Sequence, residues 1–219
     1  MSHTYTLSDF DFELPESLIA QHPATERSAS RLLDGRSLPA QDRIFKDLPS
    51  LLKAGDLLVF NDTQVVKARL FGEKTTGGKA ELLVERVLTH HKVVAHMKVS
   101  KKPPMGGVLH MAGGPDHGGF TATLLGRWPN EDGQLFRFQF SDEPHTLMQQ
   151  HGHMPLPPYI ERHQNTADPQ HETEEDKAED ERRYQTVFAK HPGAAAAPTA
   201  ALHFDEGVLA ALQAQGVHT

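Results

Sequence analysis

Five short runs of β-forming residues follow one another between residues 70 and 150, and turns containing glycine, proline or asparagine separate them. Strands that recur about every ten residues, with turn signals between them, are typical of a small antiparallel barrel or sandwich. We therefore predict that residues 70–150 form a small, all-β, barrel-like domain. The five runs are Lys79–Leu88, Lys92–Ser100, Gly107–Met111, Phe120–Arg127 and Gln134–Ser141.

The segments on either side, residues 1–69 and 151–219, contain helical as well as strand-like patterns. We predict that they form one discontinuous α/β main domain of mixed α and β content, into which residues 70–150 are inserted. A strand is predicted at Asp56–Asn61, because a continuous apolar run between turn residues is typical of a strand buried on both faces. Helices are predicted at Leu14–Ile19, Leu48–Leu52, Arg182–Lys190 and in the segment that Asp205 would cap and Gly216 would end.

The formal net charge of the chain is −7, and most of it lies in one segment. The residues from Glu172 to Glu181 are mostly acidic and include a single lysine, so the rest of the chain is nearly neutral. The whole segment His163–Glu181 has almost no apolar residue to bury, which predicts a mobile acidic linker. The net charge therefore excludes a basic coat over the whole protein, but it allows a local basic patch.

Cysteine is absent from the 219 residues, which excludes a disulfide framework and a metal site built on thiolates. No stretch approaches the roughly 20 apolar residues that span a bilayer, and the N-terminus lacks the pattern of a signal peptide. These features predict a soluble, cytoplasmic protein with no membrane partner. The 15 histidines show no pair at the spacing of ligands on one helix face, so we expect no metal site. A metal-dependent hydrolase would instead require stoichiometric metal in the purified protein.

The stretch Tyr184–Phe204 is rich in small residues and is interrupted by Pro192 and Pro198. Small residues allow a backbone or a ligand to approach closely, and proline prevents the alanine run from continuing as a helix. Thr199 and His203 then stand four residues apart in an otherwise apolar setting. The stretch is either a packed turn with one hydrogen-bonded histidine or a tight connection that presents a hydroxyl and an imidazole to a site.

Two other polar clusters each have two interpretations. Asn61, Asp62 and Thr63 stand at the carboxyl end of the predicted strand, where sites of α/β proteins often lie, but they also suit a plain turn. A basic cluster lies at the edges of the predicted β domain, where it either contacts a phosphate backbone or forms an ordinary solvated strand face. Its residues are Lys98, Lys101, Lys102 and Arg127.

Four segments, in the same order along the chain, resemble the S-adenosylmethionine:tRNA ribosyltransferase-isomerases of queuosine biosynthesis. They are DFDFELPESLIAQHP (Asp9–Pro23), GDLLVFNDTQVVKARLFG (Gly55–Gly72), GHMPLPPYIER (Gly152–Arg162) and YQTVFA…GAAAAPTAALHF (Tyr184–Phe204). One such segment could arise by chance, but four collinear segments make the match close. The resemblance extends from Asp9 to about Val217 and is weak between Lys92 and Gln150.

The resemblance implies an enzyme that uses S-adenosylmethionine as a ribosyl donor. The ribosyl carbon skeleton would move to the exocyclic amine of 7-aminomethyl-7-deazaguanine at the wobble position of a tRNA and isomerise, giving epoxyqueuosine, adenine and methionine. The implied partners are the tRNA and S-adenosylmethionine, which is a substrate, so no cofactor is expected. We also expect a monomer.

The resemblance also implies which residues form the site. His203 is expected to transfer protons as a catalytic residue. Asp62, the second expected catalytic residue, would hold a ribose hydroxyl or face the sulfonium. The expected substrate-binding residues comprise polar side chains near Asp62, arginines for a phosphate or the methionine carboxylate, tyrosines that stack on a base, and a hydroxyl. They are Asn61, Thr63, Arg69, Tyr159, Arg162, Tyr184 and Thr199.

Two departures from the family pattern qualify this expectation. Members usually have glycine where this chain has Ala201, and alanine would strain the loop if the position required a positive φ. Members also continue well beyond the point where this chain ends at Thr219, so the main domain is expected to be C-terminally incomplete, and we expect little or no transferase activity from these 219 residues alone. The competing function is therefore a non-catalytic, truncated remnant that acts as a tRNA- or partner-binding module.

Overall fold

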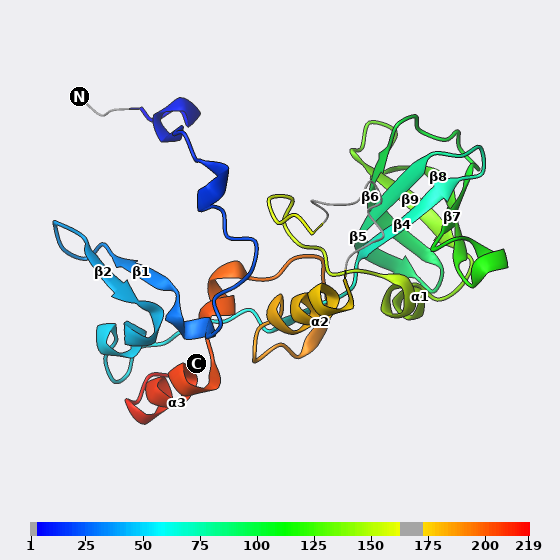
Figure 1. The fold of residues 1–219 in the computed structure, drawn as a ribbon. Helices are drawn as coiled ribbons and strands as arrows, with labels where there is room; N and C mark the ends of the chain where they lie inside the picture. The colour runs from blue at the N-terminus through cyan, green and yellow to red at the C-terminus, as the bar shows by residue number, and fades with distance from the viewer. Residues whose placement is uncertain (1–3, 163–172) are drawn as a thin grey trace.

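The computed structural model describes residues 4–162 and 173–219, and its most regular part is a closed β-barrel (Figure 1). Six antiparallel strands form the barrel in the order β4-β5-β6-β9-β8-β7. The five predicted runs coincide with β5 to β9, so the expected antiparallel β unit is confirmed and it is a barrel. The strands are β4 (Arg69–Lys74), β5 (Lys79–Thr89), β6 (Lys92–Val99), β7 (Val108–Met111), β8 (Phe120–Trp128) and β9 (Leu135–Phe140).

The barrel interior is filled by side chains that alternate along the strands. In β9, Phe136, Phe138 and Phe140 are buried, and the residues between them are more exposed. This alternation follows from the two-residue period of a strand, which sends every second side chain into the barrel. Helix α1 (Pro144–His151) packs against the barrel, because its buried Leu147 and Met148 belong to the same apolar cluster.

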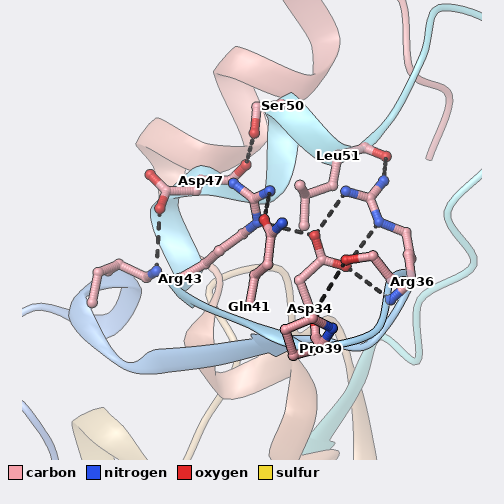
Figure 2. A network of polar contacts seen from close by, with 10 residues as sticks. Asp34, Arg36, Pro39, Gln41, Arg43, Asp47, Ser50 and Leu51 are labelled. Carbon is pink, nitrogen blue, oxygen red and sulfur yellow. Dashed lines mark hydrogen bonds and ion pairs between the residues drawn. The ribbon is translucent and has the colours of Figure 1, made fainter.

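A hairpin far from the barrel is held together by a buried carboxylate. Strand β1 (Arg31–Asp34) pairs antiparallel with β2 (Gln41–Ile44). The Asp34 carboxylate accepts hydrogen bonds at 2.9 Å from Arg36 Nε and Nη2 and from Arg43 Nε (Figure 2). Hydrogen bonds from Arg36, and then from Arg43, hold the pKa of Asp34 well below its usual range, despite its burial.

We expect Asp34→Asn to lower the free energy of unfolding at neutral pH. A depressed carboxylate pKa contributes stability above the ordinary value of about 3.9, and this contribution is lost as the pH falls toward the folded-state value. The difference in the free energy of unfolding between the variant and the parent should therefore shrink when urea denaturation is measured at pH values from about 5 down to about 2. Asp42→Asn is the matched control, because Asp42 forms an exposed pair with Arg31 on the same hairpin. A difference in the free energy of unfolding that stays constant with pH would contradict the lowered pKa of Asp34.

Helix α3 (Glu206–Ala214) forms as the sequence predicts. The carboxylate of Asp205 caps its first turn by accepting a hydrogen bond from the backbone N–H of Val208 at 2.8 Å. Gly216 follows the helix with a φ of 81°, a left-handed conformation that glycine adopts without strain. Val208 and Leu212 are buried in a second core, which α3 forms with the segment after the hairpin.

The apolar run Asp56–Asn61 is not the strand buried on both faces that we predicted. It is an extended segment with one bridge, a parallel contact between Leu57 and His218. Leu57 and Val59 are 66% and 87% exposed, while the residues that alternate with them pack against the second core. The prediction was wrong because an apolar run does not report whether a neighbouring strand covers its second face.

A short parallel sheet joins the two halves of the chain outside the barrel. Strand β3 (Thr63–Val65) pairs with β10 (His191–Ala194). The side chain of Gln185 extends this pairing, because it accepts from Val65 N at 3.0 Å and donates to Val65 O at 3.2 Å. The helix that we predicted over Arg182–Lys190 is absent beyond its first two residues, since the chain here turns toward β10.

Part of the acidic segment that we predicted to be a mobile linker forms a helix. Residues 163–172 lie outside the described residues, but Glu174–Arg183 form helix α2. Thr173 caps this helix by accepting from the N–H of Asp176 at 3.0 Å. Asp180 is only 3% exposed, so this part of the segment packs against the rest of the protein.

The remaining helical segments are short 3-10 helices. The helix predicted at Leu14–Ile19 is reduced to three residues, and Leu18 is 72% exposed because no core faces it. The helix predicted near Leu48–Leu52 corresponds to η4. Within the described ranges, every helix is too short or too polar to cross a membrane. The 3-10 helices are η1 (Leu7–Phe10), η2 (Glu16–Leu18), η3 (Arg27–Ala29), η4 (Phe45–Leu51), η5 (Pro115–His117) and η6 (Thr199–His203).

Candidate functional site

One cavity of about 500 Å³, the main cavity, gathers five of the predicted site residues. It lies between residues 20–31, residues 156–162, the end of α2 and η6. Its walls are mostly apolar and carry a few polar groups, which is the usual composition of a small-molecule site. The five predicted residues are Tyr159, Arg162, Tyr184, Thr199 and His203.

His203 reaches the main cavity from the last position of η6. Pro198 precedes this helix in an extended conformation and so starts it abruptly after the alanine run. The imidazole is half-buried, and its ring centroid lies 5.4 Å from that of Phe45. This packing holds the side chain at the cavity wall.

Ala201 does not strain the turn that carries His203. It lies inside η6, and Ala112 is the one non-glycine residue with a positive φ in the part of the chain that the structure describes. The strain considered for alanine at a glycine position therefore does not arise here, because it depends on a positive φ.

Arg162 is engaged by a buried carboxylate. Its Nε and Nη2 donate to the two carboxylate oxygens of Asp180 at 2.9 and 2.6 Å, and its Nη1 donates to the carbonyl of Gln21. The side chains of Arg162 and Asp180 are 7% and 4% exposed. Hydrogen bonding to Asp180 raises the pKa of Arg162, and Asp180 neutralises its charge. Arg162 therefore shapes the cavity more than it offers a free positive charge to a ligand.

The two predicted tyrosines differ in exposure. Tyr184 is buried, and burial raises the pKa of its phenol, which is hydrogen-bonded to the backbone of Ala197. Tyr159 is 53% exposed at the rim of the main cavity. Of the two, Tyr159 has the more accessible ring for stacking on a planar ligand.

Sequence reasoning missed three arginines that line the main cavity, Arg27, Arg31 and Arg183, of which Arg31 forms an exposed pair with Asp42. Arg27 donates to the carbonyls of Arg182, Arg183 and Leu202, and burial followed by the nearby charge of Arg183 lowers its pKa. Arg183 donates to the carbonyls of Ala24 and Thr25. Among the described residues, no carboxylate is hydrogen-bonded to either guanidinium as Asp180 is to Arg162, although the charges of Glu206 and Asp205 act on Arg27. The positions of these arginines carry no local motif, and only their common place in the fold identifies them.

Three further predicted site residues lie outside the main cavity: Asn61, Asp62 and Thr63. Asn61 Oδ1 accepts from the N–H and the hydroxyl of Thr63 at 2.9 and 2.6 Å, which forms a local turn. Asp62 pairs with His191 at 3.1 Å at the start of the β3–β10 pairing. Asn61, Asp62 and Thr63 are not among the lining residues of the main cavity, and their roles stay predictions.

Arg69 lines a separate groove of about 450 Å³, the barrel groove. Its Nη2 donates to the carbonyl of Leu156 at 2.9 Å, and its Nε lies 3.3 Å from a carboxylate oxygen of Glu81. The barrel groove and the main cavity share Leu156, Ile160 and Arg162. Residues 156–162 therefore form the wall between the two sites, so Arg69 is adjacent to the main cavity without lining it.

Residues 7–219 match the sequence profile of a family described as "Queuosine biosynthesis protein". The chain belongs to this family. The chain is 48% identical over 216 residues to the S-adenosylmethionine:tRNA ribosyltransferase-isomerase of Dechloromonas aromatica, strain RCB. It is 50% identical over 213 residues to the protein of the same name from Herminiimonas arsenicoxydans. These alignments cover 98% and 97% of the chain.

The chain spans 56% of the length of each of these relatives. A crystal structure of an S-adenosylmethionine tRNA ribosyltransferase from Thermotoga maritima aligns with 96% of the chain and 55% of that protein, at 25% identity. The TM-score of this alignment is 0.33, which is too low for a comparison of the two folds.

The four family-like segments of the chain converge in space. Residues from the ends of Asp9–Pro23, Gly152–Arg162 and Tyr184–Phe204 line the main cavity. Arg69 and Phe71, from the end of Gly55–Gly72, line the adjoining barrel groove. Segments that are far apart in sequence and share a family resemblance thus surround one pair of neighbouring sites.

Proposed function

We propose that this chain carries the S-adenosylmethionine site of a tRNA ribosyltransferase-isomerase and acts in queuosine biosynthesis. The observation that carries the proposal is the convergence of three family-like segments on the main cavity. The curated relatives named for this activity support it. The proposed reaction transfers the ribosyl moiety to 7-aminomethyl-7-deazaguanine in tRNA and isomerises it to epoxyqueuosine, releasing adenine and methionine.

The main cavity offers groups of the types that this chemistry requires. The sulfonium acidifies the neighbouring C5′ protons, and His203 is the proposed base that removes one of them. The methionine carboxylate is proposed to bind Arg27 and Arg183, the positive charges that no described carboxylate neutralises by direct hydrogen bonding. Tyr159 is proposed to stack on adenine at the rim of the cavity.

We further infer that residues 70–150 are a domain inserted into a discontinuous main domain. The β3–β10 pairing supports this division, because it joins chain segments that precede and follow the barrel. The Arg27 hydrogen bonds to α2 and η6 join the same two segments. In this proposal the protein is a cytoplasmic monomer whose partners are the tRNA and S-adenosylmethionine.

Release of adenine from S-adenosylmethionine tests the proposed function. The chain is incubated with S-adenosylmethionine and a tRNA that carries the aminomethyl base, and adenine is quantified by chromatography. The sequence predicts little or no activity from these 219 residues alone, whereas the proposed site predicts release that depends on both substrates. The unmodified tRNA transcript is the control. Tight tRNA binding without adenine release would favour the alternative, a non-catalytic binding module. Absence of both would reject the proposed function.

A further inference from the structure

The barrel gathers four cations from two separate parts of the chain, and we call them the basic barrel end. Lys98 is at the end of β6, Lys101 and Lys102 follow it, and Arg127 is near the end of β8. The antiparallel order of the barrel places these strand ends on the same side, and Phe136 of β9 connects them. The Lys102 ammonium and the Arg127 guanidinium each lie 5.2 Å from the centroid of this one ring.

The four cations of the basic barrel end are exposed. Among the residues that the structure describes, no carboxylate forms an ion pair with any of them within 4 Å. Cations elsewhere are commonly neutralised, as Arg36 and Arg43 are by Asp34. A group of unneutralised cations on a chain of net charge −7 creates a local positive field that attracts a polyanion.

The basic barrel end continues into the barrel groove. Lys98 belongs to both, because it lines the groove together with Arg69. The other walls of the groove include the apolar side chains of Phe71, Leu156 and Pro158 and the carboxylates of Glu81 and Glu161. A groove with cations at its edge and apolar or aromatic walls suits an unstacked nucleotide base whose phosphate remains outside.

We propose that the basic barrel end binds the phosphate backbone of the tRNA and that the barrel groove receives one unstacked base. This inference rests on the proposed function, because the substrate of that reaction is a base within a tRNA. The shared wall of residues 156–162 then sets the base next to the main cavity, which is proposed to hold S-adenosylmethionine. A continuous surface thus leads from the barrel end to the groove that adjoins the donor site.

The test is a triple charge reversal with a matched control. The variant Lys98→Glu/Lys101→Glu/Lys102→Glu is compared with Lys46→Glu/Lys53→Glu/Lys92→Glu, which changes the net charge equally. The control lysines are exposed, and they lie outside the basic barrel end, on or just after η4 and at the start of β6. Binding of the tRNA with the aminomethyl base is measured by fluorescence anisotropy at several salt concentrations. We expect the first variant to bind the tRNA at least about tenfold more weakly. The slope of log affinity against log salt concentration should fall by the amount that about two to three phosphate contacts contribute.

Equal loss of affinity in both triple variants would overturn the inference, because it would reflect net charge alone. Unchanged tRNA binding by the first variant would overturn it as well. If charge reversal prevents folding, as judged by circular dichroism, Lys101→Gln/Lys102→Gln replaces it, with several-fold weaker binding expected and Lys46→Gln/Lys53→Gln as its control. Adenine release by the parent chain is measured in parallel. If the parent chain releases no adenine but the first variant alone loses tRNA binding, only the proposed reaction is rejected. If the parent chain releases adenine and the first variant binds tRNA as the parent does, only the proposed RNA surface is rejected.

Discussion

Replacing Asp180 with alanine is expected to lower the free energy of unfolding by about 3 kcal/mol, because it leaves the Arg162 charge buried without a partner. Arg162 and Asp180 are 7% and 4% exposed and are joined by two hydrogen bonds. Arg162→Ala should have an effect of similar size, since it removes the guanidinium that donates to both oxygens of the buried carboxylate. Urea denaturation at neutral pH measures both values.

Two comparisons separate this effect from the general consequences of substitution. Removing both charges with Arg162→Met/Asp180→Leu should cost much less than either single change, because no isolated charge remains. Breaking the pair between Lys177 and Glu174 should cost less than about 1 kcal/mol, because Glu174 is 88% exposed there. If Asp180→Ala lowered the free energy of unfolding only slightly, the buried pair would be contradicted. The prediction from composition, that the segment of α2 is a mobile linker, would then be favoured.

Replacing His203 with alanine is expected to slow adenine release by about 100-fold or more, if the imidazole removes the proton as proposed. The reason is its position at the wall of the main cavity, where its ring packs against Phe45. The measurement is the rate of adenine release with saturating S-adenosylmethionine and tRNA. Full activity of His203→Ala would remove this residue from the mechanism.

A matched substitution tests whether the effect belongs to the site. His96 is an exposed histidine on β6, outside the main cavity, and His96→Ala should leave the rate unchanged. The thermal midpoint of His203→Ala should also change little, because the imidazole is only half-buried. A large fall of the midpoint would assign the loss of activity to unfolding.

The barrel was predictable because its determinants are local. Most of its strands show an alternation of buried and more exposed residues, as β9 does with Phe136, Phe138 and Phe140. Turn residues between the runs then limit how successive strands can pair. Helix α3 was predictable for the same reason, because its cap, its apolar face and its terminating glycine lie within a few residues of one another.

The errors arose where the decisive contact is remote in sequence. The composition of the acidic segment predicts no packing, yet Asp180 is buried because Arg162 reaches it from 18 residues away. The apolar run Asp56–Asn61 predicts a strand that is buried on both faces, yet one of its faces is exposed. In both cases the composition of the segment was used to predict its burial, which depends on the packing partners that surround it.

For the site, the residue types and the four family-like segments were evident in the sequence, and they predicted His203 and Tyr159, both of which line the main cavity. Tertiary structure decided which of the predicted residues meet. It brought Arg27 into the main cavity from a segment without a motif, and it placed Asp62 beside His191 at the β3–β10 pairing. The physical reason is that a cavity is defined by long-range packing of several segments, whereas the sequence pattern reports only what each segment favours by itself.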